Sequence, residues 1–236
     1  YFEDYIWGKA IRPNTIPLEK DDFLLELAFT RNILRRYYIN FRSKSGIHLD
    51  TWNQIVINGD LLFNIENPSD LALILLDAIQ PIGITNLFLD SHGVIPVLGA
   101  LAPDIPLLPV QILEGSSISL LAKVFSIHSK AKTGTPIIKV RVEYKDGTYT
   151  EDQIIKGSIT KLPVSTGQIV KIFIEPISPL DMNQFGKNID KGVITQGGLC
   201  GVIFDARGRP IQLQKNLDER IDQFKTWYKS LGINLA

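Results

Sequence analysis

The stretch Ser69–Ala102, SDLALILLDAIQPIGITNLFLDSHGVIPVLGALA, carries the pattern that decides the fold. Its apolar residues up to Ile79 recur at three- and four-residue steps, which predicts a helix that ends at the following Pro-Ile-Gly sequence. Ile84–Leu89 predicts a buried strand, and Gly93–Ala102 predicts a second, short helix. Together with the short strand that Trp52–Ile57 predicts, this order of elements is typical of a βαβ architecture.

The pattern changes to a period of two from Val110 onward, after three closely spaced prolines. Asp146-Gly147 is a strong signal for a hairpin turn, because both residues tolerate a positive φ. Short strands separated by glycine turns predict an antiparallel β-barrel or a β-sandwich. The predicted strands are Ile118–Phe125, Ile137–Tyr144, Thr148–Ile154, Gly157–Leu162, Gln168–Glu175, Val193–Gln196 and Leu199–Asp205.

Two longer helices flank these segments, and residues 1–20 predict irregular structure. Residues 21–44 predict an amphipathic helix, and we interpret its arginines, among them Arg31 and Arg35, as a solvated flank. Near the other end of the chain, Asn216 can cap a helix that is expected to pack back on the rest of the protein. The apolar stripe of that helix consists of Leu217, Ile221, Phe224 and Tyr228. We therefore expect an α/β part over 1–108, a mostly antiparallel β domain over 109–211 and a C-terminal helix over 212–236.

Composition limits the possible functions. The 236 residues include 25 Lys+Arg and 25 Asp+Glu, and this neutral balance argues against nucleic-acid binding and against a polybasic membrane anchor. A single cysteine excludes an internal disulfide framework, and the three histidines lack the spacing of metal ligands. No segment predicts a membrane span or a signal peptide, so we expect a cytoplasmic protein. Because the chain starts at Tyr1 without an initiator Met, we interpret it as a piece of a longer protein.

The most distinctive local motif is Asp205-Ala-Arg-Gly-Arg-Pro, in which one carboxylate precedes two arginines. A guanidinium group can pair bidentately with a carboxylate or with a phosphate. Two interpretations follow. Either Asp205 bridges Arg207 and Arg209 in a structural ion-paired turn, or the two arginines bind an anionic ligand or an acidic partner surface.

No group of residues predicts a catalytic site or a metal site. Cys200 lies in an apolar segment with no predicted base beside it, so we interpret it as a small buried hydrophobic residue. Asp90-Ser91-His92 is interpreted as a turn at a strand end with a helix cap, because the members of a catalytic triad are seldom adjacent in sequence.

Three stretches resemble the C-terminal part of the glutamate mutase accessory protein family called MutL or GlmL, which is distinct from the DNA mismatch-repair protein of that name. They are residues 75–102, residues 197–213 (GGLCGVIFDARGRPIQL) and residues 219–232 (ERIDQFKTWYKSLG). The resemblance covers residues 5–236, and its most specific element is Asp205–Pro210. The family looks like actin-type ATPases, so the resemblance implies that residues 1–108 form a partial actin-like lobe followed by an added β domain.

The resemblance also implies where a nucleotide would lie. Asn58, Gly59 and Asp60 match the loop that approaches the adenosine, but family members usually carry a glycine pair there and this chain has only Gly59. The phosphate-binding strand would belong to an N-terminal lobe that does not precede Tyr1. ATP is therefore expected only with that missing lobe, and no cofactor is expected in this chain alone. Asp77, unusual within an apolar helix, would face either a neighbouring backbone or the nucleotide cleft.

The function implied by the resemblance is that of a non-catalytic part of an actin-like ATPase-family accessory protein. Its β domain would act as an interaction or regulatory module. Its partners would be its own missing N-terminal lobe and a cobalamin-dependent mutase or another protein. Two alternatives stay open: a fragment of an ATP-dependent enzyme whose active site needs the missing lobe, and a small-ligand-binding domain that uses the loop 176–192.

Overall fold

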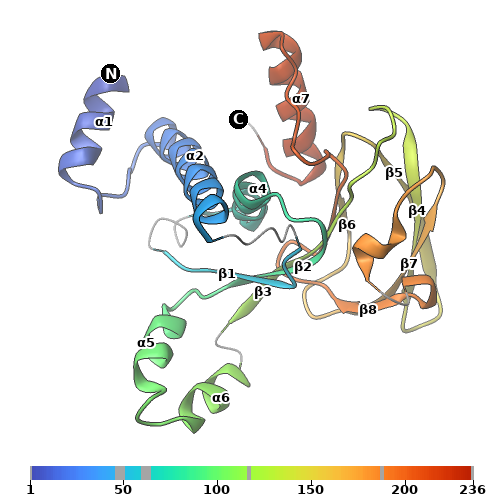
Figure 1. Ribbon diagram of the computed structural model, residues 1–236, viewed down its shortest axis with the longest axis horizontal. Helices are drawn as coiled ribbons and strands as arrows, with labels where there is room; N and C mark the ends of the chain where they lie inside the picture. The colour runs from blue at the N-terminus through green and yellow to red at the C-terminus, as the bar shows by residue number, and fades with distance from the viewer. Residues whose placement is uncertain (1, 46–50, 60–64, 116–117, 187–188, 235–236) are drawn as a thin grey trace.

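The computed structural model describes residues 2–45, 51–59, 65–115, 118–186 and 189–234. A five-stranded sheet lies between a layer of helices and a four-stranded sheet (Figure 1). The first sheet has the strand order β1 (Gln54–Ile57), β2 (Gly83–Leu89), β3 (Ser119–Ser126), β9 (Val202–Asp205) and β6 (Ile159–Leu162). The second sheet has the strand order β5 (Tyr149–Ile155), β4 (Pro136–Tyr144), β7 (Ile169–Pro176) and β8 (Val193–Gln196).

The helices lie outside the two sheets. The α-helices are α1 (Phe2–Ile11), α2 (Lys20–Ser45), α4 (Pro68–Ile79), α5 (Val94–Leu101), α6 (Leu107–Leu113) and α7 (Leu217–Ser230). Two short 3₁₀ helices, η1 (Met182–Phe185) and η2 (Ile189–Lys191), precede β8. Of the helices that the structure describes, none combines the length and the apolar character that crossing a membrane requires.

The first sheet is mixed and joins segments from both ends of the chain. Strand β1 pairs with β2 in parallel, β2 pairs with β3 in antiparallel, and β3 pairs with β9 in parallel. The predicted boundary at 108/109 falls within α6, and the strands on its two sides, β2 and β3, are hydrogen-bonded neighbours over most of their length. The α/β part and the β part therefore share one sheet.

The β-barrel that the sequence offered as one alternative is wrong, because neither sheet closes on itself. The strands do not follow one another in a single meander. After β5 the chain leaves the second sheet, and β6 pairs with β9 in the first. The two sheets face each other instead, with a core of large side chains between them. At its centre the rings of Phe125 and Phe204 stack 4.7 Å apart.

The opposite face of the first sheet is covered by helices. Helix α4 buries nearly its whole apolar surface there, and its leucines pack with Leu87 of β2, Leu121 of β3 and Ile203 of β9. Asn67 caps this helix, because its side-chain oxygen accepts the backbone N–H of Ser69 at 2.9 Å. Helix α2 packs on α4. The amphipathic helix predicted over 21–44 needed such a neighbour to cover its apolar face.

Helix α7 packs on the same core with Phe224 and Tyr228 of the predicted stripe and with Trp227, which the stripe did not include. Trp227 is 3% exposed and joins the α4 core together with Leu231. Leu217 and Ile221, by contrast, are 60% and 41% exposed. The stripe is therefore wrong for the first half of α7, which extends beyond the sheet, whereas the second half is docked (Figure 1).

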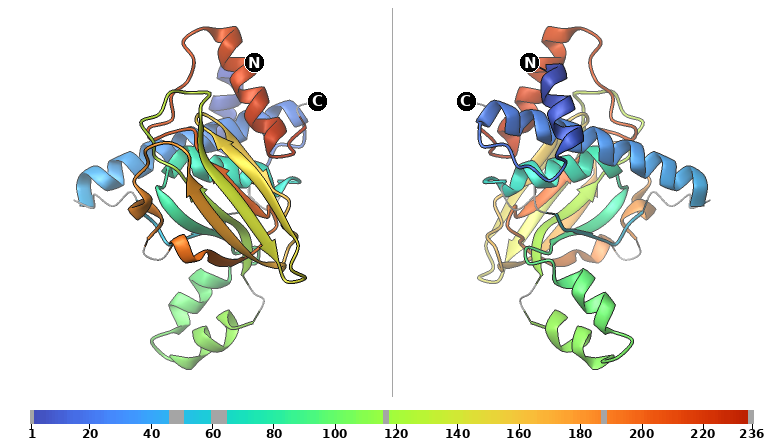
Figure 2. Two further views of the ribbon diagram at one scale, coloured as in Figure 1. Left: turned by 90° about the vertical axis from the view of Figure 1, so that its right-hand side faces the viewer. Right: turned by 90° about the vertical axis from the view of Figure 1, so that its left-hand side faces the viewer.

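Two further segments differ from the sequence prediction. Residues 2–11 form the helix α1 rather than irregular structure, and residues 107–113 form α6 where alternation had been expected from Val110. Figure 2 shows that α5 and α6 project from the sheets at the end of the molecule opposite to α7. This pair of helices contributes little to the core, since Leu98 is its one buried residue among those described.

Candidate functional site

The Asp205–Pro210 motif starts at the last residue of β9 and forms a buried ion-pair network. Asp205 and the side chain of Arg207 are both 0% exposed. The guanidinium donates to both carboxylate oxygens, from Nε to Oδ1 at 2.9 Å and from Nη2 to Oδ2 at 2.8 Å. The backbone N–H of Arg207 also donates to Oδ1 at 3.1 Å. The turn is thus closed by a bidentate pair.

Arg209 joins the network from the other side of Asp205. Its Nη2 donates to Asp205 Oδ2 and to the hydroxyl of Ser126 on β3, each at 3.0 Å. Its Nε donates to the carbonyl of Pro81, which follows α4, at 2.9 Å. One carboxylate therefore holds both arginines of the motif, and Arg209 links the motif to two other segments of the fold.

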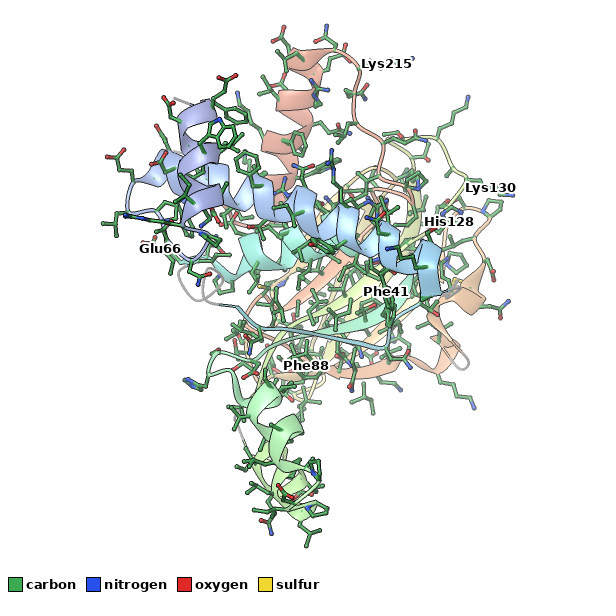
Figure 3. The ribbon with its side chains drawn as sticks, turned by 60° about the vertical axis from the view of Figure 1, so that its left-hand side comes forward. Phe41, Glu66, Phe88, His128, Lys130 and Lys215 are labelled. Atoms are coloured by element: carbon green, nitrogen blue, oxygen red, sulfur yellow. The ribbon has the colours of Figure 1, made fainter. Side chains whose placement is uncertain are left out.

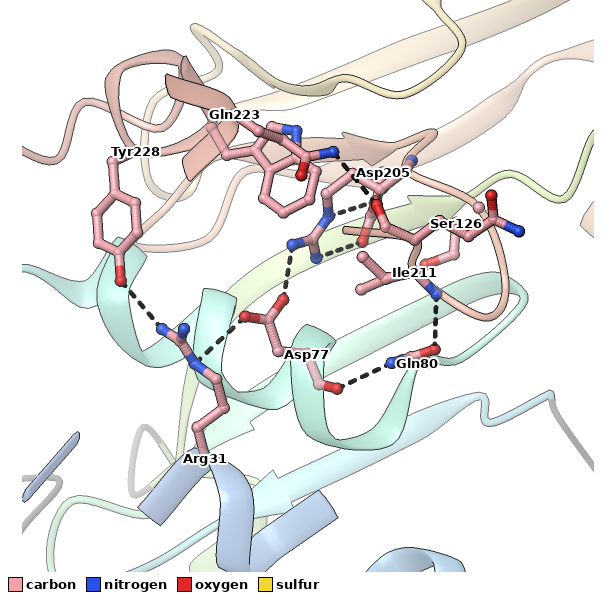
Figure 4. A network of polar contacts seen from close by, with 12 residues as sticks. Arg31, Asp77, Gln80, Ser126, Asp205, Ile211, Gln223 and Tyr228 are labelled. Atoms are coloured by element: carbon pink, nitrogen blue, oxygen red, sulfur yellow. Dashed lines mark hydrogen bonds and ion pairs between the residues drawn. The ribbon is translucent and has the colours of Figure 1, made fainter. Parts of the chain in front are cut away.

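Asp77 completes the network from α4, as Figure 4 shows. Its Oδ1 accepts from Arg207 Nη1 at 2.6 Å, and its Oδ2 lies 3.2 Å from Arg31 Nε on α2. The expectation that Asp77 faces a neighbouring backbone is therefore wrong, whereas the nucleotide cleft stays a prediction. The interpretation of Arg31 as part of a solvated flank is also wrong, since Arg31 donates further to the hydroxyl of Tyr228 on α7 at 3.0 Å.

Trp227 fastens α7 to this network. The Arg207 guanidinium carbon lies 4.9 Å from the centre of the Trp227 ring, within cation–π range. The indole N–H donates to the carbonyl of Gly157 at 3.0 Å. Sequence analysis did not identify Trp227, because its partners are distant in the chain.

The ion pairs of this network shift the pKa values of its buried groups toward their charged forms. Burial by itself would raise the pKa of Asp205, but the charges and hydrogen bonds of Arg207 and Arg209 hold it well below its ordinary value. Burial by itself would likewise lower the pKa of Arg207, and the charges of Asp205 and Asp77 instead raise it. Asp205 and Arg207 therefore both remain charged at neutral pH.

A pocket of about 330 Å³ lies directly beside the network. Its walls come from the loop 128–133 between β3 and β4, from Lys156 and Gly157 after β5, from residues 207–214, and from Gln223 of α7. No aspartate or glutamate is among the described residues that line it. The pocket wall therefore combines three cationic residues, Lys156, Arg207 and Arg209, with neutral ones.

Lys156 is the cation of this pocket that forms no ion pair within the described residues. It is half-buried, and among the described residues none forms a hydrogen bond or an ion pair with its ammonium group. Burial, and then the charge of Arg209, lower its pKa. Gly208 leaves room for it: a Cβ at this glycine, whose φ is +99°, would lie 2.9 Å from Lys156 Nζ. All three N–H donors of Lys156 thus have no partner in the described part of the chain and are available to a ligand.

The predicted nucleotide-proximal residues lie elsewhere, at the carboxyl end of β1. Asn58 Nδ2 donates to Asp90 Oδ2 at 3.1 Å, and Asp60 lies outside the described residues. Gly59 follows at the end of β1, with a φ of +152°. Asp90 also accepts the backbone N–H groups of Val94 and Ile95 at the start of α5. Asp90 thus forms a helix cap, the role that sequence analysis gave it.

Two further candidates for chemistry are the single cysteine and possible metal-ligand clusters. Cys200 is buried, and burial raises the pKa of its thiol to about 11, so the thiolate form is scarce at neutral pH. No cluster of three or more histidine, cysteine, aspartate or glutamate side chains in the described part of the chain could hold a metal ion.

Comparison of the chain with protein-family models, with curated proteins and with solved structures gave no match. The resemblance to the glutamate mutase accessory protein family therefore stays a prediction, and the candidate site must be interpreted from its own geometry.

Proposed function

We propose that this chain is a ligand-binding module that takes a small oxyanion, a phosphate or a carboxylate, in the pocket beside Lys156. The observation that carries the proposal is the ammonium group of Lys156, half-buried at the pocket and without a hydrogen-bond or ion-pair partner among the described residues, so that the charge of Asp205 acts on it only through space. A partly desolvated cation is destabilised until an anion compensates it. The pocket offers that anion one free ammonium group and the positive field of Arg209.

The charges around the pocket favour the same ligand. Arg207 and Arg209 share Asp205, and Asp77 compensates Arg207 and Arg31, so the two acids face three arginines before Lys156 is counted. All three side-chain nitrogens of Arg209 already donate to partners within the protein. Lys156 is therefore the direct ligand contact, and Arg209 contributes through its charge. The volume suits a small metabolite rather than a polymer.

The same place gives the predicted family relationship a structural context. The three stretches that carry the resemblance contribute Asp77, the Asp205–Pro210 motif and Trp227, which meet in one network beside the pocket. We accordingly propose that the module belongs to an accessory protein of that type, in which ligand binding regulates rather than performs chemistry. What supports this is the convergence of the three stretches on one site.

Isothermal titration calorimetry of the full chain tests the binding proposal, with inorganic phosphate and succinate as separate probes. Saturable binding is expected for at least one of them. Lys156→Gln should weaken that binding about tenfold, or ~1.4 kcal/mol, since a charge-assisted hydrogen bond contributes about 1.5–3 kcal/mol and water screens part of it here. The two probes separate a phosphate ligand from a carboxylate ligand.

Lys130→Gln is the matched control, because Lys130 lies on the same loop as His128 but is exposed and does not line the pocket (Figure 3). Binding to this variant should equal that of the natural chain. No saturable binding of either probe, or an equal loss in both variants, would refute the pocket as an anion site.

A further inference from the structure

We propose that an anion bound at Lys156 locks helix α7 onto the body of the protein, so that the pocket controls the docking of this helix. This inference rests on the proposed function, since it needs the pocket to be filled. It names α7 as the element that responds to the ligand.

Helix α7 is buried against the rest of the protein at one end only. Its second half is anchored by Trp227, and Leu231 and Ile233 beyond it join the α4 core. Its first half is exposed at Leu217 and Ile221 and contributes no buried residue. Segments with few buried apolar contacts open at low free-energy cost. The first half of α7 is therefore the part of the helix that a small added interaction can stabilise.

Gln223 stands between the two halves and belongs to the pocket. Its Oε1 accepts from the backbone N–H of Gln214 at 3.1 Å, and its Nε2 donates to the carbonyl of Gln212 at 3.2 Å. All three glutamines line the pocket. The side chain of Gln223 thus connects α7 to the segment between β9 and α7, at the pocket wall that a ligand would touch.

The second connection runs through Trp227. Its indole donates to Gly157, the residue after Lys156, and its ring covers Arg207, which forms part of the pocket wall. A ligand that contacts Lys156 on the sheet side and Gln223 on the helix side therefore bridges the body and α7. Because such a ligand binds the docked arrangement more tightly than an undocked one, binding and docking must favour each other by linkage.

Hydrogen exchange of the full chain tests this coupling, measured with and without saturating inorganic phosphate or succinate, whichever binds by calorimetry. At a ligand concentration near 100 times Kd, amides of residues 217–230 that exchange through undocking should slow by up to about 100-fold. Amides of the β4–β5 hairpin, which does not line the pocket, should be unchanged. In Lys156→Gln the slowing at the same ligand concentration should largely disappear.

Gln223→Ala separates the coupling from binding itself. This variant loses the ligand contact on the helix side, so it should bind the probe more weakly, and at a concentration that again saturates the pocket it should lose most of the ligand-dependent slowing in α7. Thr226→Ala, a neutral exposed change on the same helix, should retain the slowing. A probe that binds by calorimetry yet leaves α7 exchange unchanged would overturn the coupling and leave the binding proposal standing. A chain that binds neither probe would overturn the proposed function, and the coupling with it.

Discussion

The substitution Asp205→Asn tests how much the buried network stabilises the fold. Asparagine keeps the size of the side chain and an oxygen that can accept the backbone N–H of Arg207, so the change removes mainly the charge. Arg207 and Arg209 both lose their shared counter-ion, and only Asp77 continues to compensate Arg207. Removing one partner of a buried ion pair costs about 3–5 kcal/mol, and the remaining Asp77 contact places the expected loss near the lower figure.

A loss of about 3 kcal/mol corresponds to a fall in Tm of roughly 6–12 °C for a chain of this size. Urea unfolding and thermal unfolding, both followed by circular dichroism, measure the two quantities. Glu151→Gln is the control, because the Lys139–Glu151 pair has a similar distance of 2.8 Å but is open to solvent, and its removal should leave the Tm nearly unchanged. A fall in Asp205→Asn no larger than in this control would refute the assignment of the network as a structural anchor.

Three further outcomes follow from the structure. Arg207 and Arg209 lower the pKa of Asp205 in the folded state, so the stability that the Asp205 carboxylate contributes is complete above its ordinary pKa near 4 and is lost as the pH falls below that value. The urea midpoints of the natural chain and of Asp205→Asn should therefore converge on acidification. A constant difference between the two midpoints at all pH values would contradict this pH dependence. Asn67→Ala should cost about 1 kcal/mol in urea unfolding, because it removes the cap of α4, and an unchanged midpoint would contradict that role. Cys200, buried and with a raised pKa of about 11, should react with a thiol-specific disulfide reagent far more slowly in the native chain than in urea; equal rates would show that it is accessible.

Local patterns predicted most individual elements. The apolar period of α2 and α4, the Asp146-Gly147 turn between β4 and β5, and the β-branched runs of β7 and β8 all have causes within a few neighbouring residues. Helix α6 was missed because its apolar residues, interrupted by Pro109, support a strand as readily as a helix. The sequence could not distinguish a closed barrel from two separate sheets, since strand pairing depends on contacts between distant segments.

The candidate site was predictable only in its local part. Asp205, Arg207 and Arg209 lie within five residues, and their spacing alone permits the turn that they form. Asp77 pairs with Arg207 from 130 residues away, and nothing near Asp77 in the sequence indicates that partner. Lys156 looked like one ordinary lysine among many, because its importance comes from a pocket wall that four separate segments build and in which no described residue is an acid.

The placement of β9 determines when the molecule can be completed during synthesis. This strand fills the position between β3 and β6, and both of these emerge from the ribosome before it does. Until Val202–Asp205 has been made, β3 keeps an open edge and β6 lacks its partner in the first sheet, so a nascent chain exposes pairing groups that can recruit another chain. Chains that terminate before β9 would consequently be substrates for chaperones and proteases rather than shortened working proteins.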